Sequence, residues 1–134
     1  MTKTIVTAND NDDLKKVIEK LKKNTIRHIP IVKGKEVVGI ISRTDINRLT
    51  FGALFDGQEG TDEAILDMLT ISQVMTSKPK TVSSDTSIRD LAEIFAKEDF
   101  HALPVVDNGE LKGIVTTTDV VKYFLEQYEC IFNF

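Results

Sequence analysis

The chain has 134 residues, 41% of them apolar, and a formal net charge of -4 from 17 basic and 21 acidic side chains. This length suits one domain or two small ones with a hydrophobic core, and the acidic balance gives no general attraction for nucleic acid. No apolar run approaches the ~20 residues that span a bilayer, the single cysteine (Cys130) cannot form an intramolecular disulfide, and no signal-peptide pattern follows Met1, so the sequence favours a cytoplasmic protein without membrane insertion.

An internal repeat organises the chain. When the sequence is slid along itself by 74 residues, residues 14–48 align with residues 88–122, and both identities and the apolar pattern are kept. Such self-similarity indicates a duplicated structural unit. The predicted organisation is repeat 1 at 1–48, a connector with one helix (62–69) at 49–73, repeat 2 at 74–128 and a tail at 129–134.

Each copy is predicted to start with a short strand, at residues 4–6 and at residues 80–82. An amphipathic helix follows, from Leu14 in the first copy and from Ile88 in the second. In both, apolar residues recur at i, i+3, i+4 and i+7, which places them on one helix face. Ser87 precedes the second helix as a capping residue.

A hairpin follows each of these helices. Its strands are predicted at 29–32 and 37–41 in the first copy, and at 103–106 and 111–115 in the second. Asn108-Gly109 supplies the positive φ angles of a tight turn. Pro30 and Pro104 are expected at a strand start or edge, because proline has no N–H for a ladder. With a last helix after each hairpin, the fold class is α/β (α+β), two β-α-β-β-α units.

Each hairpin ends in a hydroxyl residue followed three positions later by an aspartate, Ser42 with Asp45 and Thr116 with Asp119. These residues could simply cap the last helix of each copy. They could also bind a ligand, because a carboxylate accepts two hydrogen bonds from a vicinal diol and a helix N-terminus suits an anion. Both interpretations stay open at this point.

The duplicated set resembles the CBS domain, named after cystathionine β-synthase and found in tandem pairs called Bateman modules. The resemblance is carried by Gly39–Asp45, by Gly113–Asp119, by the proline-containing strands before them, and by Val74–Pro79 before the second copy. It implies two repeats packed with pseudo-twofold symmetry, with clefts between them that bind AMP, ADP, ATP or S-adenosylmethionine in many relatives. It also implies a regulatory role and a homodimer rather than catalysis.

Carried over residue by residue, the resemblance implies that Asp45 and Asp119 hold ribose hydroxyls, with Ser42 and Thr116 near ribose or phosphate. Basic residues before the proline strand would meet phosphate, namely Arg27, His28 and His101. Thr81 and Val82 would lie beside the base. We expect the second cleft to bind better, because Arg27 and His28 would face its phosphate and because the first copy has a loop two residues longer.

The resulting hypothesis is a non-catalytic regulatory module that binds a small adenosyl ligand and needs no cofactor. The alternative is a structural or dimerisation module without a ligand. No paired carboxylate, nucleophile–base pair or metal cluster suggests an enzyme, and the two histidines lack cysteine partners for zinc. The expected homodimer faces are those that carry Val17, Leu21, Leu91 and Phe95.

Overall fold

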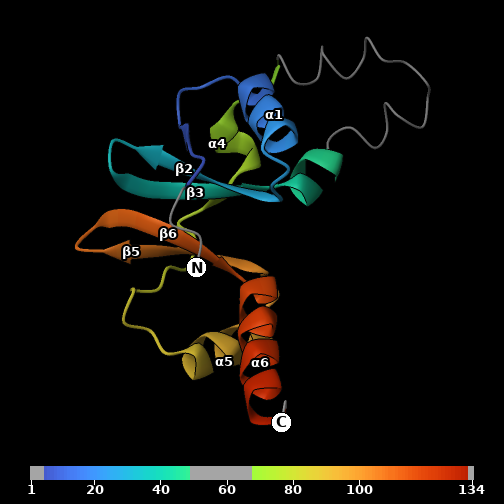
Figure 1. The fold of residues 1–134 in the computed structure, drawn as a ribbon. Coiled ribbons are helices and arrows are strands. Elements are labelled where there is room, and N and C mark those ends of the chain that lie inside the picture. The colour runs from blue at the N-terminus through green and yellow to red at the C-terminus, as the bar shows by residue number, and fades with distance from the viewer. Residues whose placement is uncertain (1–4, 49–67, 133–134) are drawn as a thin grey trace. The chain divides into compact units, whose positions relative to one another are not determined.

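The computed structural model describes residues 5–48 and 68–132, with side chains as far as Tyr128 (Figure 1). The helix predicted at 62–69 therefore lies outside the described residues except for its last two. The chain divides into two compact units, which are treated separately: unit 1 comprises Met1–Ile5 and Lys80–Phe134, and unit 2 comprises Val6–Pro79.

Unit 2 contains a four-stranded sheet with the strand order β1-β2-β3-β4. Strand β1 runs parallel to β2, whereas the pairs β2–β3 and β3–β4 are antiparallel. A further helix occupies residues 43–48. The elements in chain order are β1 Ala8–Asn9, α1 Leu14–Lys23, β2 His28–Lys33, β3 Glu36–Ser42, α4 Ile71–Val74 and β4 Thr76–Ser77.

Unit 1 repeats the same plan with a two-stranded hairpin, and Val82 adds a parallel bridge to Val105. Helices α5 and α6 lie on the same side of this hairpin (Figure 1). Each unit thus follows the predicted order β-α-β-β-α. The elements are α5 Ile88–Lys97, β5 Ala102–Asp107, β6 Glu110–Thr116 and α6 Thr117–Phe132.

The duplication extends to an irregularity inside both hairpins. The β2–β3 register shifts between Ile31 and Val32, and the β5–β6 register shifts between Val105 and Val106, which is 74 residues further on. A β-bulge increases the local twist of a hairpin, and bulges are usually kept at equivalent positions in related structures. The 74-residue offset therefore relates the backbones of the two copies, as the sequence predicted.

The first strand of the first copy is not where the sequence placed it. Residues 5–7 form no strand, and the pairing partner of Ile31 is Ala8, just as Val82 pairs with Val105. Ala8 thus corresponds to Val82, so the loops that lead from these residues to the first helix of each copy have equal length. The longer loop expected in the first copy is wrong, because the apolar segment before Ala8 was taken for the strand.

The two prolines lie third in β2 and third in β5 rather than at a strand start. Pro104 is on an edge strand, as predicted, because its sheet consists of β5 and β6 with one isolated bridge from Val82. Pro30 lies in β2, which is between β1 and β3, one residue before the pairing with β1 begins at Ile31. The Val82 N–H donates to the Pro104 oxygen (3.1 Å), so the ring nitrogen of Pro104 faces the same neighbour. Val82 is bridged to Val105, the residue after Pro104, and its two backbone hydrogen bonds use the Pro104 oxygen and the Val106 N–H. The N–H that proline lacks is therefore not needed for this bridge.

The apolar faces of α1 and α5 belong to the cores of their own units. Val17 is fully buried, and Leu21 and Leu91 are nearly so, while Phe95 packs against the core of unit 1. The prediction that these faces form a dimer interface is wrong, because each covers its own sheet. Among the described residues, a group of exposed apolar side chains lies instead on α6, at Val121, Phe124, Leu125 and Tyr128.

Unit 2 has a core component that repeat matching does not predict. Ile71 of α4 is completely buried in the cluster that includes Val17, Ile31 and Ile41. A capping box starts α4, since Thr70 Oγ1 accepts from the Gln73 N–H and Gln73 Oε1 accepts from the Thr70 N–H. The last residues of the predicted connector (49–73) thus complete the core of unit 2.

Candidate functional site

The hydroxyl and aspartate pairs form reciprocal caps. In unit 2 the Asp45 N–H donates to Ser42 Oγ (3.1 Å), and the Ser42 N–H donates to Asp45 Oδ2 (3.0 Å). In unit 1 the Asp119 N–H donates to Thr116 Oγ1 (3.2 Å), and the Thr116 N–H donates to Asp119 Oδ2 (2.9 Å). The helix-cap interpretation is therefore confirmed. The hydrogen bond from the N–H of Ser42 or Thr116 uses only one of the two oxygens of each aspartate carboxylate.

The strand pairing brings the other candidates of unit 2 to the same end of its hairpin. His28 pairs with Ser42 across β2 and β3, and the Arg43 N–H donates to the Arg27 oxygen (2.8 Å). Arg27 is exposed, whereas His28, Ser42 and Asp45 are half-buried. Four predicted residues thus come from three consecutive segments and lie at one end of the unit.

Unit 1 has the same arrangement with different side chains. Ala102 pairs with Thr116, and both the N–H and the hydroxyl of Thr117 donate to the His101 oxygen, at 3.0 and 3.1 Å. His101 is exposed, and Thr116 is half-buried. His101 therefore lies beside the Thr116–Asp119 cap within its own unit.

A cavity of about 200 Å³ lies inside unit 1 next to Asp119. Its wall is mainly apolar and comes from the loop after Val82, from α5, from the hairpin and from the first turns of α6. Val82 and Asp119 line it, whereas Thr81, His101 and Thr116 do not. The lining residues are Val82, Ser83, Ser84, Thr86, Ile88, Leu91, Val105, Val115, Asp119, Val120 and Tyr123.

Hydroxyl groups form the polar part of this wall. Thr86 Oγ1 accepts from the Ser83 N–H (3.2 Å), and the Ser84 N–H donates to Asp107 Oδ1 (3.0 Å), which ties the loop to the hairpin turn. Hydrogen bonds from the Ser84 hydroxyl and N–H lower the pKa of Asp107. In unit 2 the residues that correspond to Ser83 and Thr86 are Asn9 and Asp12. The Asn9 N–H donates to Asp12 Oδ2 (2.9 Å), and this hydrogen bond lowers the pKa of Asp12.

Sequence reasoning missed most of the cavity. Tyr123 is not among the site residues predicted from the sequence, yet it lines the cavity together with Asp119. The signal was available, because residues four apart share a helix face and Tyr123 follows Asp119 by four positions. The three hydroxyl residues after Val82 gave no such signal, since a loop has no fixed period.

The cavity and the carboxylate at its edge are suited to binding a small molecule. An apolar wall can bury a flat base or another apolar group, and the carboxylate of Asp119 can accept hydrogen bonds from hydroxyl groups at its edge. Among residues 5–48 and 68–132, no three side chains of the metal-binding types come together. No helix in the described part of the chain is long and apolar enough to cross a membrane.

Known structures and sequences match this architecture. Protein MJ1225 of Methanocaldococcus jannaschii is 32% identical over 126 residues, which cover 92% of this chain and 45% of that protein, and its crystal structure superposes with a TM-score of 0.78. Protein MJ1426 of the same organism is 32% identical over 146 residues, covering 91% of this chain and 86% of that protein. This chain spans less than half the length of several matching relatives, MJ1225 among them.

A further solved structure contains bound ligands. The CBS domain pair of protein MJ0100, in complex with 5′-methylthioadenosine and S-adenosyl-L-methionine, is 28% identical with a TM-score of 0.75, and the match covers 92% of this chain and 93% of that one. The family model of the CBS domain matches residues 1–51 and 71–126, most of the sequence. The chain, with its two copies of one β-α-β-β-α unit, therefore belongs to the CBS domain family.

Proposed function

We propose that this chain is a non-catalytic regulatory module that binds a small adenosyl ligand, with one binding position at the cavity of unit 1. The observation that carries the proposal is the position of Asp119, a half-buried carboxylate that borders a mainly apolar cavity. A group of this kind beside an apolar wall suits a nucleoside, which joins a flat base to a vicinal diol.

The chemistry of each part can be assigned. Val82 and Tyr123 would flank the base, and the Asp119 oxygen that the Thr116 N–H does not use would accept from a ribose hydroxyl. Pockets for drug-sized ligands are typically about 300–1,000 Å³, so the cavity of about 200 Å³ would hold only part of such a ligand. The ligands bound to MJ0100 share an adenosine core, which supports the same class here.

The other site residues predicted from the sequence do not line the cavity, but they remain proposed ligand contacts. Asp45 and Ser42 form the equivalent cap in unit 2, with Arg27 and His28 beside it, and Thr81 and His101 flank the cavity segments in unit 1. AMP, ADP, ATP and S-adenosylmethionine are all members of the proposed ligand class. A cytoplasmic location, and control of an enzyme, channel or transporter, complete the hypothesis.

The test compares two matched aspartates. We expect Asp119→Ala to weaken binding of 5′-methylthioadenosine by tenfold or more, because a hydrogen bond to a charged group contributes about 1.5–3 kcal/mol. Asp45→Ala removes an equivalent cap at nearly the same distances, but Asp45 belongs to unit 2 and does not line the unit 1 cavity, so this substitution should change that affinity little. Calorimetric titration of both variants measures the difference.

Thermal unfolding provides the control. Both substitutions remove one cap, which costs about 0.5–2 kcal/mol, so the two variants should lose similar stability. A ligand that binds only the folded state must also raise the melting temperature of the wild type. The proposal is wrong if no adenosyl compound binds the wild type, or if both aspartates affect binding equally.

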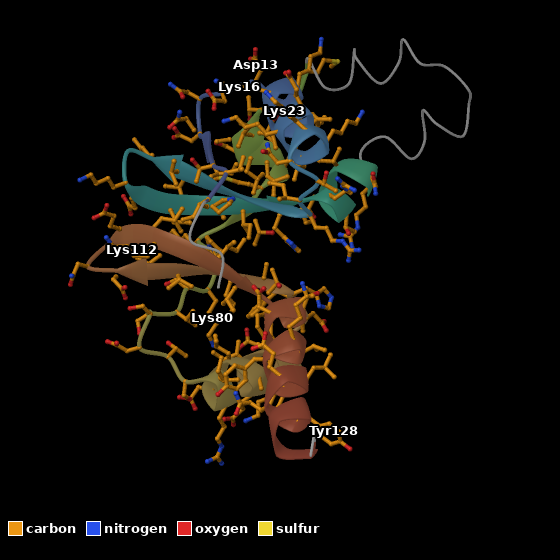
Figure 2. All side chains as sticks on the ribbon, viewed as in Figure 1. Asp13, Lys16, Lys23, Lys80, Lys112 and Tyr128 are labelled. Atoms are coloured by element: carbon orange, nitrogen blue, oxygen red, sulfur yellow. The ribbon has the colours of Figure 1, made fainter. Side chains whose placement is uncertain are left out.

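One observation favours the second candidate function, a dimerising module. Val121, Phe124, Leu125 and Tyr128 follow one another at helical spacing on α6, and each is at least half exposed. Tyr128 projects from the distal part of α6 (Figure 2). We propose that this stripe pairs with the same stripe of a second copy, which makes the homodimer interface isologous.

Charge placed on this stripe should convert the dimer to a monomer. Leu125→Glu buries an unpaired carboxylate in the proposed interface, which is strongly unfavourable. Gln127→Glu adds the same charge on the same helix, at an exposed position outside the stripe, and should leave the mass unchanged. Light scattering at tens of micromolar reports the mass, and a monomeric wild type would contradict the interface.

A further inference from the structure

A short loop supplies most of the polar wall of the unit 1 cavity. It comprises residues 83–86, between the bridge at Val82 and the start of α5, and Ser83, Ser84 and Thr86 line the cavity. A segment of this kind binds a ligand best when it is already in the bound conformation, because ordering a loop on binding costs conformational entropy. The contacts that hold the loop in place therefore bear on binding at the cavity.

The loop is hydrogen-bonded mainly to itself. The Thr86 N–H donates to the Ser83 oxygen (3.1 Å), and the Ser83 N–H donates to Thr86 Oγ1 (3.2 Å). These two bonds shape a turn, but they do not attach it to the rest of unit 1. Within the described residues, the hydrogen bonds that attach residues 83–86 to another element come from Ser84, whose N–H (3.0 Å) and hydroxyl donate to the Asp107 carboxylate at the end of β5.

Unit 2 attaches the equivalent segment in a different way. Asp10 corresponds to Ser84 at the 74-residue offset, and Lys33 stands in the place of Asp107. The Asp10 N–H donates to the Val32 backbone oxygen (3.1 Å), and β1 pairs with β2 over two residues, whereas unit 1 has a single bridge here. The backbone thus holds this segment in unit 2, and a side chain holds it in the unit whose cavity is the proposed binding position.

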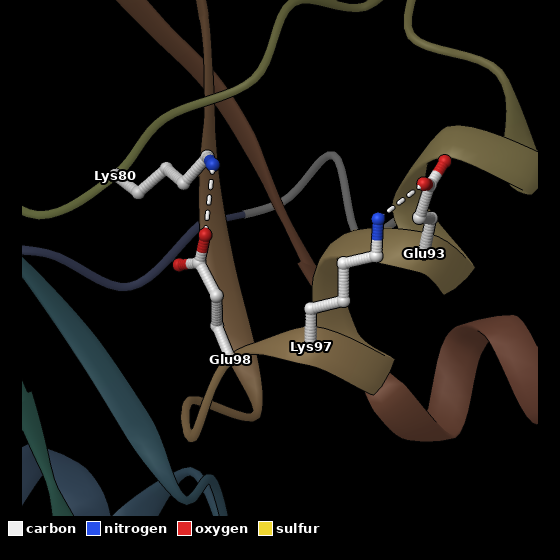
Figure 3. A network of polar contacts seen from close by, with 4 residues as sticks. All are labelled: Lys80, Glu93, Lys97 and Glu98. Carbon is white, nitrogen blue, oxygen red and sulfur yellow. Dashed lines mark hydrogen bonds and ion pairs between the residues drawn. The ribbon is translucent and has the colours of Figure 1, made fainter.

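A second side-chain contact reaches the same segment on the other side of Val82. Lys80 pairs with Glu98 just after α5 (3.0 Å), whereas Lys97 and Glu93 pair with each other within α5 (Figure 3). The side chains of Lys80 and Glu98 are 46% and 40% exposed, so solvent screens their attraction. Neither residue lines the cavity, and we expect this ion pair to contribute little to the position of the loop.

Asp107 is well suited to hold the loop. It is half-buried and directly precedes the hairpin turn at Asn108-Gly109, whose positive φ angles fix the path of the backbone. Hydrogen bonds from the hydroxyl and the N–H of Ser84 lower the pKa of Asp107, so its side chain is a carboxylate at neutral pH and can only accept. A donor bonded to a carboxylate is held more strongly than one bonded to a neutral oxygen.

We propose that Asp107 is a positioning residue of the unit 1 site, which keeps the loop of residues 83–86 in the conformation that binds the ligand. Asp107 does not line the cavity itself and acts through Ser84, which does. The inference rests on the proposed function for the identity of the ligand. The attachment of the loop does not, because it depends only on the contact between Ser84 and Asp107.

Removal of the carboxylate should release the loop. In Asp107→Ala the open fraction of the loop should rise about tenfold, because the bond from the Ser84 N–H to a partly exposed carboxylate is worth roughly that factor. A ligand that needs the closed loop then binds in proportion to the closed fraction, and we expect the affinity for 5′-methylthioadenosine to fall by about fivefold or more. Asp107→Asn keeps an oxygen that can accept from the Ser84 N–H, so its affinity should stay within about twofold of the wild type.

Two measurements on the full chain test the inference. Calorimetric titration with 5′-methylthioadenosine compares the wild type, both Asp107 variants and the control Lys80→Gln, which removes the exposed ion pair to the same segment and should change the affinity less than about twofold. Amide hydrogen exchange followed by NMR reports on the loop without any ligand. In Asp107→Ala the Ser84 N–H should exchange about tenfold faster, whereas the Val106 N–H, which donates to the Val82 oxygen (2.8 Å), should exchange as in the wild type.

The exchange of these two amides separates a released loop from a general loss of stability. The inference is overturned if Asp107→Ala leaves the exchange of the Ser84 N–H unchanged, if the Val106 N–H accelerates equally, or if Asp107→Asn binds as weakly as Asp107→Ala.

The titrations also separate this inference from the proposed function. If the wild type binds no adenosyl compound, the proposed function fails, and the role of Asp107 in binding fails with it. If Asp119→Ala weakens binding as proposed but Asp107→Ala binds like the wild type, this inference fails alone.

Discussion

Replacing Ile71 with alanine should lower the free energy of unfolding of unit 2 by about 2–5 kcal/mol. Ile71 is completely buried in one cluster with α1 and the β2–β3 hairpin, although it lies near the end of the predicted connector (49–73). The substitution removes apolar contacts and leaves a cavity that the surrounding strands cannot close, because packed cores relax only partly. Urea unfolding followed by circular dichroism measures the loss.

Met68→Ala is the matched control for this prediction. Met68 is 81% exposed and lies three residues before Ile71, so its truncation should change stability by less than about 0.5 kcal/mol. Equal effects of the two substitutions would mean that α4 does not pack into unit 2. That result would contradict the assignment of the last residues of the predicted connector to the core of unit 2.

The second large effect is expected at Gly39, in the middle of β3. A Cβ at this position would overlap the Met75 sulfur and lie 2.8 Å from the Met75 Cγ. Gly39 pairs with Ile31 on one side and with Ser77 on the other, so β3 cannot move away. We expect Gly39→Ala to destabilise unit 2 by about 1–3 kcal/mol through overpacking.

A double-mutant cycle identifies the cause. Alanine in a strand interior is normally preferred to glycine by roughly 0.5–1 kcal/mol, so a loss of stability is the opposite of the backbone trend. In a Met75→Ala background the clash is gone, and Gly39→Ala should become neutral or stabilising. Additive effects of the two substitutions would show that Met75 does not explain the glycine.

The two copies share one capping feature and differ in the side chains around it. Both copies keep the cap of a hydroxyl residue and an aspartate, at 2.9 to 3.2 Å, because the last helix of each needs its first N–H groups satisfied. Around that common feature the side chains differ, with a cavity of about 200 Å³ beside the cap of unit 1, and with Arg27 and His28 beside the cap of unit 2. Ligand choice would then depend on residues that the fold itself does not require.

Several features follow from the sequence alone because they depend on local patterns. The two amphipathic helices follow from the apolar period, and the second hairpin turn follows from Asn108-Gly109, both of which have positive φ. The order β-α-β-β-α and the caps at Asp45 and Asp119 follow from motifs that repeat at one offset. These features need no knowledge of which distant segments meet.

Other features were decided only by tertiary structure. The first strand begins at Ala8, because its register is set by Ile31 of the neighbouring strand and a two-residue strand has no period of its own. The faces with Val17 and Leu91 proved to be core, since an apolar helix face looks the same in sequence whether a sheet or a partner covers it. The cavity beside Asp119 and the burial of Ile71 depend on segments that are far apart in the chain, and only three-dimensional packing brings such segments together.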